Sequence, residues 1–255
     1  MLYFSFCLYQ IPPSPTILAA SFLSTFAVYG LNKVTDTIED SINKPEEKQS
    51  KQSRLLIPSI ASYILSLIIG ATEGPIVFAI LLTPLFIGVI YSIKICKYMP
   101  RLKEVLGVKS LLVAFSWAFT GALLPAALTQ IELTKIALIF TYIFIQLLIN
   151  TIIFDALDVK GDAISKVKTI PMALGRKKTK HALLAINSVL LLWIGYCVTF
   201  GFFQSYLPAL SFGVLYSYAI IWFFTSDRER KRFSAEVFVD GEWIPMFIIL
   251  RSIMR

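Results

Sequence analysis

The chain alternates between long apolar runs that carry no charge and shorter connections that hold most of its charged residues. The uncharged runs at 55–72, 75–93 and 110–131 are each long enough to cross a hydrocarbon core of about 30 Å as a helix. The pattern predicts helical spans at 15–31, 55–72, 75–93, 110–131, 136–155, 181–202, 206–224 and 236–250, with an incomplete ninth helix in residues 1–11. We therefore expect an all-α, polytopic transmembrane bundle of 8–9 helices, formed by residues 1–255 as a single domain.

Composition agrees with this expectation. Hydrophobic residues make up 56% of the chain and its mean hydropathy is +0.72, whereas soluble domains are about 45–50% apolar. The short alternating segments of a transmembrane β-barrel are missing from the sequence. Residues 1–11 lack the basic residues that begin a cleavable signal peptide. The sequence thus predicts an integral, multi-pass membrane protein.

Basic residues gather in every second connection. The segments 32–54, 94–109, 156–180 and 225–235 hold all but three of the 24 Lys and Arg residues, the exceptions being Lys135, Arg251 and Arg255. By the positive-inside rule, these four connections face the cytoplasm. Topology and contact with anionic membrane lipids account for the net charge of +8, so we expect no nucleic-acid partner.

Acidic residues form two regular groups on that same side. Asn32, Asp36 and Asp40 are four residues apart, and they line one face of a helix. Asp155, Asp158 and Asp162 also share a face for as long as their helix continues, which Gly161 is expected to limit. Because like charges at this spacing repel each other, a cation is expected between the two groups.

Mg²⁺ is the cation that best suits carboxylate groups of this kind. It prefers oxygen ligands, and it commonly binds one or two carboxylates together with substrate phosphates. Two facing acidic groups can hold two Mg²⁺ ions with a diphosphate between them. A diphosphate at the membrane surface whose apolar tail enters the bilayer is most simply an isoprenyl diphosphate. Some of the 20 Phe, 11 Tyr and 4 Trp residues are candidates for lining a tail tunnel, although core packing explains aromatic residues equally well.

The two motifs together resemble those of the UbiA superfamily of intramembrane prenyltransferases. The family pattern N-x-x-x-D-x-x-x-D is matched by Asn32, Asp36 and Asp40. The second pattern, D-x-x-D-x-x-G-D followed by T-x-P and Gly, is matched by DALDVKGD at 155–162 and by Thr169, Pro171 and Gly175. Between them, YSIK at 91–94 is similar to the Tyr/Lys segment of the family. Order, spacing and helical bundle agree over most of the chain.

The resemblance implies a Mg²⁺-dependent transfer of an isoprenyl group, for example from geranylgeranyl diphosphate, to an aromatic or lipid acceptor. It implies metal binding and catalysis by Asp36, Asp40, Asp158 and Asp162, with Asp155 as a further ligand and Asn32 as a ligand or orienting residue. The diphosphate is expected to contact Lys94 first, then Lys168 and Arg54, while Tyr91 shields the developing cation. The sequence departs from the family where Glu46 and Glu47 replace expected basic residues, so that Lys48, Lys51 or Arg54 must substitute for them.

Two other interpretations remain at the level of sequence. A CDP-alcohol phosphotransferase also combines Mg²⁺ with a diphosphate, but its D-G-x-x-A-R signature does not occur in this chain. A membrane transporter or ion-binding protein with acidic sites at the cytoplasmic face is the second alternative. Transporters typically carry charges near the midplane on broken helices in repeat-related positions, whereas the acids here lie at one surface and no inverted repeat is evident.

Overall fold

The computed structural model describes residues 1–35, 54–92, 102, 105–165, 167–225 and 232–253, and the regular elements in this part of the chain are all helices. Six of them are long and apolar enough to cross a membrane. These six are α2 (Pro15–Thr35), α4 (Leu56–Glu73), α6 (Val108–Ala126), α7 (Leu133–Leu157), α9 (Ile170–Phe200) and α10, with its preceding turn, at Gln204–Phe224. A further apolar helix, α5 (Pro75–Ser92), follows α4 after Gly74. The expected all-α transmembrane bundle is therefore confirmed.

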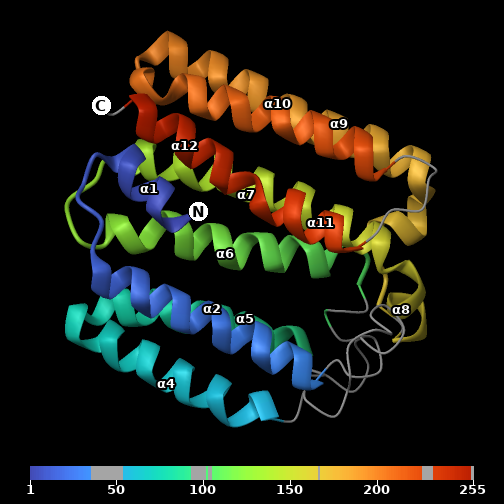
Figure 1. The fold of residues 1–255 in the computed structure, drawn as a ribbon, viewed down its shortest axis with the longest axis horizontal. Helices are drawn as coiled ribbons and strands as arrows, with labels where there is room; N and C mark the ends of the chain where they lie inside the picture. The colour runs from blue at the N-terminus through green and yellow to red at the C-terminus, as the bar shows by residue number, and fades with distance from the viewer. Residues whose placement is uncertain (36–53, 93–101, 103–104, 166, 226–231, 254–255) are drawn as a thin grey trace.

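The first residues form the short helix α1 (Leu2–Tyr9), as the expected incomplete ninth helix. It lies against α6 and α7 (Figure 1). Almost all of its side chains are buried, including the polar Ser5. Tyr9 Oη donates a hydrogen bond to the Ala122 carbonyl at 3.0 Å, so the helix is fixed within the bundle although it is too short to span it.

The structure corrects two predicted boundaries. The third basic connection, expected at 156–180, instead contains the short helix α8 (Val159–Ile164) and the first turns of α9. Arg and Lys are good helix formers, so the basic run from Arg176 to Lys180 continues as helix beyond a kink at Gly175, whose φ is 71°. Lys180 lies 3.2 Å from the centre of the Trp222 ring, which gives one of these cations an aromatic partner.

The last predicted span, 236–250, is broken into two helices. These are α11 (Arg232–Phe238) and α12 (Trp243–Ile253), joined by the short 3₁₀ turn η4 (Asp240–Glu242). The sequence pattern indicated one continuous helix with Asp240 and Glu242 in its first turns. The break is stabilised by α7, because Asn150 Nδ2 donates hydrogen bonds to Glu242 Oε1 at 2.9 Å and to the Val239 carbonyl at 3.3 Å.

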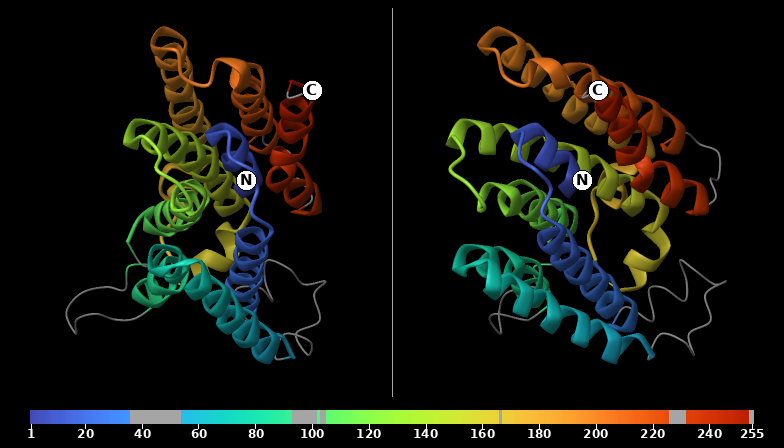
Figure 2. Two further views of the ribbon diagram at one scale, coloured as in Figure 1. Left: turned by 90° about the vertical axis from the view of Figure 1, so that its left-hand side faces the viewer. Right: turned by 60° about the vertical axis from the view of Figure 1, so that its left-hand side comes forward.

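The helices pack in two groups joined through α6 (Figures 1 and 2). One group consists of α2, α4 and α5, and the other of α7, α9, α10 and α12. Close approach between α2 and α4 depends on Gly30, because a Cβ there would collide with the Ser59 side chain. In the second group, Tyr142 lies fully buried and donates to the Leu210 carbonyl at 2.9 Å. Large apolar side chains such as Ile57 and Leu192 are exposed, as expected for surfaces that face lipid.

The alternating chain direction brings the helix ends next to the basic connections together. In Figure 1, the ends of α2, α5, α7 and α10 and the starts of α4, α6, α9 and α11 are all the right-hand ends of these helices. The opposite side carries the short connections, including the turn η3 (Gln204–Tyr206). The second acidic motif, at the end of α7 and in α8, is therefore positioned at the basic end of the bundle.

Candidate active site

A buried cluster of two carboxylates and one lysine lies where α6 begins and α7 ends. Lys109, in the first turn of α6, places its Nζ atom 2.7 Å from Asp162 Oδ1 and 3.2 Å from Asp155 Oδ1. Both carboxylates are almost fully buried, whereas the Lys109 side chain keeps 25% of its surface exposed. Because a buried carboxylate is costly unless it is paired, this lysine allows α7 and α8 to bury two acids side by side.

The oxygen atoms of the two carboxylates are engaged to different degrees. Asp155 Oδ2 accepts a hydrogen bond of 2.5 Å from Ser110 Oγ, so both of its oxygens have partners. Thr151 supports this arrangement by donating to the Ser110 carbonyl at 3.4 Å. Asp162 Oδ2, in contrast, is buried and has no hydrogen-bond partner within the described ranges. The cluster thus presents one buried oxygen that a ligand can still satisfy.

The chain turns within the second motif instead of continuing one helix through it. α7 ends at Leu157, before Gly161, which we expected to limit the helix and which lies inside α8. Asp158 forms the junction with φ −96° and ψ 6°, and its backbone N–H still donates to the Phe154 carbonyl at 3.0 Å. The turn carries Asp162 back towards the bundle, so that it meets Asp155 at Lys109 although the two no longer share one helix.

Gly107 fixes the position of Lys109 relative to α8 and α9. Its φ of 75° suits glycine, and its N–H donates to the Lys168 carbonyl at 3.1 Å. A Cβ at this position would lie 3.2 Å from Ile170 Cγ1, so a larger residue would also crowd the start of α9. This backbone link holds the first turn of α6 beside the segment that follows the second motif.

Burial and the neighbouring lysine shift the pKa of Asp162 in opposite directions. The pKa of its carboxyl is raised to about 6 in total: burial is the largest cause of the increase, and the adjacent Lys109 ammonium counteracts part of the effect of burial. The other acids of the motif, Asp155 and Asp158, add to the increase because like charges disfavour ionisation. At neutral pH the carboxylate form is still favoured, as metal binding requires.

The second motif fits a hard divalent cation only in part. Carboxylate oxygens are suitable ligands for Mg²⁺, and the unpartnered Asp162 Oδ2 atom is a candidate donor. Within the described ranges, however, no three His, Cys, Asp or Glu side chains are grouped so that they form a metal site by themselves. A bound Mg²⁺ ion therefore requires further oxygen atoms, from other residues of the chain or from a substrate.

Several of the residues predicted for the site lie outside the described residues. These are the two carboxylates of the first motif and the lysine expected at the diphosphate, namely Asp36, Asp40 and Lys94. Tyr91 belongs to the last turn of α5, and its backbone alone is described. Their roles therefore stay predictions.

The other predicted residues have defined positions at the same end of the bundle. Asn32 is exposed in the last turns of α2, where its carbonyl accepts a hydrogen bond of 3.2 Å from Thr35 Oγ1. Arg54, just before α4, and Lys168, just before α9, are also exposed. Asp158 is partly buried between α7 and α8. Of the predicted residues, the structure brings Asp155 and Asp162 into one cluster through Lys109.

Lys109 and Ser110 belong to the candidate site through their contacts with Asp155 and Asp162, and the acidic motifs of the sequence do not point to them. Lys109 was counted among the lysines that set topology, and Ser110 was read as the start of an apolar span. One signal does exist in the sequence. A lysine in the first turn of a helix is unfavourable, because it lies next to the positive end of the helix dipole. The position of Lys109 at the start of α6 therefore predicts an acidic partner.

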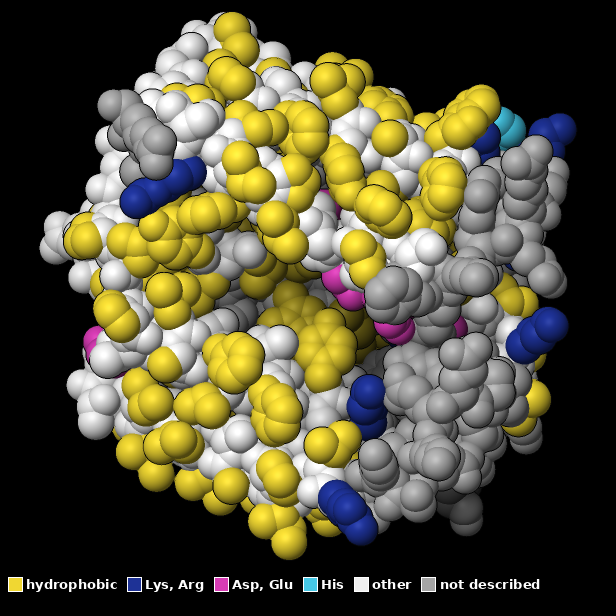
Figure 3. All heavy atoms as spheres, viewed as in Figure 1, with side chains coloured by type: hydrophobic (Ala, Val, Ile, Leu, Met, Phe, Trp, Pro, Cys, Tyr) yellow, Lys and Arg dark blue, Asp and Glu magenta, His cyan; other side chains and the backbone are white. Residues whose placement is uncertain are grey.

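The face of the molecule seen in Figure 3 is hollowed over α6, between α2 and the pair α11–α12. Hydrophobic side chains form the floor of this hollow, and acidic side chains appear at its rim. In the same part of the bundle, Tyr29 of α2 stacks on Trp117 of α6 with ring centres 5.9 Å apart. An apolar hollow with acids at one edge suits a molecule that has an apolar chain and a polar head.

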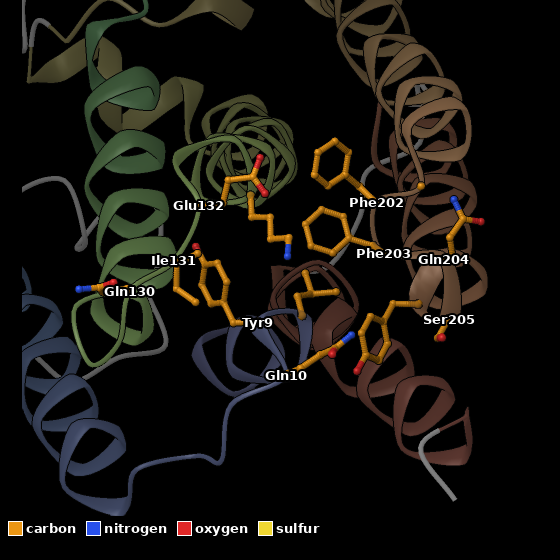
Figure 4. A pocket seen from close by; sticks show the side chains of 13 residues that line it. Tyr9, Gln10, Gln130, Ile131, Glu132, Phe202, Phe203, Gln204 and Ser205 are labelled. Carbon is orange, nitrogen blue, oxygen red and sulfur yellow. The ribbon is translucent and has the colours of Figure 1, made fainter.

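A separate cavity of about 310 Å³ opens at the opposite end of the bundle (Figure 4). It is lined by the end of α1, the start of α7 and the connection between α9 and α10, with Tyr9, Glu132, Lys135 and Phe203 among its side chains. Glu132 precedes the first residue of α7, whereas Asp155 lies in its last turn. Because a helix rises 1.5 Å per residue, about 35 Å of α7 separates the cavity from the carboxylate cluster. This cavity is therefore not part of the candidate site.

Comparisons of the whole chain place this fold among known proteins. The structure of a UbiA homolog from Aeropyrum pernix K1, without ligand, matches with a TM-score of 0.68 and 15% identity, covering 97% of this chain and 94% of that chain. A UbiA homolog from Archaeoglobus fulgidus bound to GPP and Mg²⁺ matches with a TM-score of 0.62 and 14% identity, covering 99% and 93% of the two chains. A UbiA homolog from Archaeoglobus fulgidus bound to DMAPP and Mg²⁺ matches with a TM-score of 0.64 and 16% identity, covering 99% and 92% of the two chains.

These identities are low, so the structural matches establish the fold alone. A search of curated proteins finds no match. The sequence profile of the UbiA prenyltransferase family, however, matches residues 4–247, which is nearly the whole chain. The match spans both acidic motifs and the helices between them, as the resemblance of the motifs predicted. The chain belongs to the UbiA prenyltransferase family.

Proposed function

We propose that the protein is an intramembrane prenyltransferase that uses Mg²⁺ to transfer an isoprenyl group from a polyprenyl diphosphate to an aromatic or lipid acceptor. The observation that carries this proposal is the buried Asp155–Lys109–Asp162 cluster, whose Asp162 Oδ2 atom has no partner in the described structure. Family membership supports the reaction class, and Mg²⁺ with GPP or DMAPP occurs in the Archaeoglobus fulgidus homolog.

In this proposal, carboxylates of both motifs hold the metal. Asp36, Asp40, Asp158 and Asp162 are the principal ligands, with Asn32 and Asp155 as further ligand candidates. When bound, Mg²⁺ neutralises the negative charge that develops on the departing diphosphate. Lys94, Lys168 and Arg54 are the basic residues proposed to contact the diphosphate itself.

The reaction breaks the bond between C1 of the prenyl chain and the diphosphate oxygen, which keeps both electrons. C1 then gains a bond to an electron-rich carbon or oxygen of the acceptor, which loses a proton. The residues that surround the prenyl chain have to exclude water, because water would otherwise trap the cation-like intermediate state. The apolar floor of the hollow over α6 is suited to this task (Figure 3), and Tyr91 is proposed to face the developing positive charge.

The purified protein provides a direct test. It is incubated with Mg²⁺ and geranylgeranyl diphosphate in the presence of phenolic, prenylated glycerol phosphate, tetrapyrrole or isoprenoid acceptors, and the products are identified by mass spectrometry. A prenylated acceptor that forms only with active protein and Mg²⁺ is the expected result. No transfer to any acceptor class, from a protein shown to be folded and to bind the diphosphate, would contradict the proposal.

We place this site at the cytoplasmic face of the membrane. The support is that the helix ends next to the basic connections lie at the same end of the bundle as the second acidic motif (Figure 1). Single cysteines introduced at positions 47, 103, 178 and 229, in a variant without Cys7, Cys96 and Cys197, should resist an impermeant thiol reagent added to intact cells. Labelling of these positions from the outside would reverse the proposed orientation.

A further inference from the structure

We propose that Lys109 is an internal cation that occupies the second acidic motif in the absence of substrate, and that divalent metal therefore binds tightly only together with the prenyl diphosphate. This inference rests on the proposed function and adds an order of binding to it. Its basis is the contact of one ammonium group with carboxylates from two different helices.

The position of the Lys109 ammonium is one that a metal ion would otherwise favour. Its Nζ atom is 2.7 Å from Asp162 Oδ1 and 3.2 Å from Asp155 Oδ1, so it bridges α7 and α8 as a shared cation. Asp155 is held on its other side by Ser110 Oγ. The two acids are thus assembled and partly neutralised by the chain itself, without a metal ion.

Little ligand capacity is left in this motif for a metal ion alone. Of the oxygens of the two buried carboxylates, Asp162 Oδ2 is the one without a hydrogen-bond partner among the described residues. The partly buried Asp158 adds a third carboxylate to the motif, but within the described ranges no three acidic, His or Cys side chains are grouped as a metal site. Mg²⁺ prefers six oxygen ligands in octahedral geometry. A diphosphate supplies several of these oxygens, and its negative charge offsets the repulsion between Lys109 and the metal.

Removal of this lysine should therefore strengthen metal binding in the absence of substrate. Lys109→Met keeps the length of the side chain and deletes its charge, so the motif gains one unit of negative charge next to the metal position. A purely structural role of Lys109 predicts the opposite, because loosening the two carboxylates would weaken a metal site that depends on their placement.

The experiment measures Mn²⁺ binding to the full-length protein in detergent, by the loss of the EPR signal of free Mn²⁺. Binding is measured without a ligand and with geranyl S-thiolodiphosphate, whose own affinity for Mn²⁺ is determined separately. For the wild type, we expect half-saturating Mn²⁺ to fall by about tenfold or more when the analogue is added. For Lys109→Met without the analogue, we expect half-saturating Mn²⁺ to be about fivefold or more below the wild-type value.

Two further variants separate charge from position. Lys109→Arg keeps a cation that can bridge two carboxylates and should bind Mn²⁺ alone as weakly as the wild type, within about twofold. Lys160→Met is the matched control, because Lys160 is exposed and belongs to the same short helix as Asp162. Its loss should also change Mn²⁺ binding by less than about twofold, since exposed charges are well screened.

If Lys109→Met does not fold, the double variant Asp155→Asn with Lys109→Met replaces it. This variant removes the Lys109–Asp155 ion pair and leaves Asp162 without a competing cation. It should again bind Mn²⁺ alone more tightly than the wild type. Equal or weaker Mn²⁺ binding by folded Lys109→Met, or by the folded double variant, would overturn the inference. Tighter binding without any response to the analogue would contradict the joint binding of metal and diphosphate, and with it the proposed function, and would leave only the competition between Lys109 and the metal in place.

Discussion

Two buried acidic side chains lie near the end of α7. Asp155 belongs to the helix, and Glu242 contacts Asn150, whose position on α7 is about 8 Å earlier along the helix axis. The two carboxyl groups have different kinds of partner. Asp155, in the last turn of α7, is paired with the Lys109 ammonium and with Ser110. Glu242, from the turn η4, accepts a hydrogen bond of 2.9 Å from Asn150 Nδ2, earlier on α7. The first acid is hydrogen-bonded to a cation and a hydroxyl group, whereas the hydrogen-bond donor to the second is a neutral amide.

The difference follows the position of each acid in the bundle. The Lys109 side chain remains a quarter exposed at the end of the bundle, where water and a soluble metal ion have access. Glu242 is 1% exposed and lies where one span is broken into α11 and α12. The amide of Asn150 also holds the carbonyl of Val239 at this break. Burial of an acid thus indicates a candidate site for chemistry where a partly exposed cation lies beside it, and otherwise it can serve the fold.

Metal removal should have the largest effect. It should abolish activity at the acidic cluster of Asp155 and Asp162 but leave the helices around Glu242 folded. We expect excess EDTA to abolish prenyl transfer, because no other group neutralises the leaving diphosphate as effectively. The helical fold should persist, since Lys109 already pairs with the acids of the second motif. Turnover and circular dichroism, measured on the same EDTA-treated sample, test both statements. Undiminished turnover in EDTA would contradict a metal-dependent reaction.

Neutralising the metal ligands should have the next largest effect. Asp36→Asn, Asp158→Asn and Asp162→Asn should each lower kcat by about a hundredfold or more, since each removes charge that positions the metal in the transition state. Glu242→Gln retains an oxygen acceptor for Asn150 and should change kcat by less than about threefold. Steady-state kinetics of the four variants measure the contrast. An equal loss of kcat in Glu242→Gln would mean that Glu242 and the acids of the two motifs do not have separate roles.

A smaller effect is expected at the lysine proposed to bind the diphosphate. Lys94→Ala should lower kcat/KM for the prenyl diphosphate by about tenfold or more, because a charge-assisted hydrogen bond is lost. Lys103→Ala, in the same basic connection, is the matched control and should change kcat/KM by less than about twofold. Initial rates at varied diphosphate concentration distinguish the two. Equal and small effects would show that the diphosphate is bound by other basic residues.

We expect the smallest effects at Glu242, the second of the two acids, where substitutions should change the stability of the fold. Asn150→Leu leaves the buried Glu242 carboxyl without its donor and should lower the free energy of unfolding by about 1–3 kcal/mol. Replacing both residues by Leu should recover part of this loss, because no unpaired polar group remains. Denaturation of the two variants in detergent gives both values. Additive losses in the double variant would show that Asn150 and Glu242 do not act as a pair.

The sequence predicted the membrane helices well because a hydrocarbon crossing leaves a local signal. A helix such as α4 needs some twenty apolar residues in a row, and this requirement is visible without any tertiary contact. The prediction of helices from the sequence fails where polar residues are part of a helix or interrupt one. Arg176 to Lys180 were expected in a connection but belong to α9, and the break at Asp240–Glu242 depends on Asn150, which is far away in the sequence.

The acidic motif of the candidate site was visible in the sequence, but its counter-ion was not. Asp155 and Asp162 were identified from their spacing, whereas Lys109 lies some fifty residues before them and was one of many basic residues in its connection. The contact between them arises because α6 and α7 pack together and because Asp158 ends α7. Pairings of this kind depend on tertiary structure, and no local pattern specifies them.

Binding of the prenyl diphosphate tests the central claim most directly, because it does not require the acceptor to be known. Labelled geranylgeranyl diphosphate is equilibrated with the purified protein in Mg²⁺ or in EDTA, and the bound fraction is measured for the wild type and for Asp162→Asn. We predict saturable binding by the wild type in Mg²⁺, and loss of at least about nine-tenths of it both in EDTA and in Asp162→Asn. Binding that is equally strong in EDTA and in Asp162→Asn would contradict a metal-dependent diphosphate site at the end of α7.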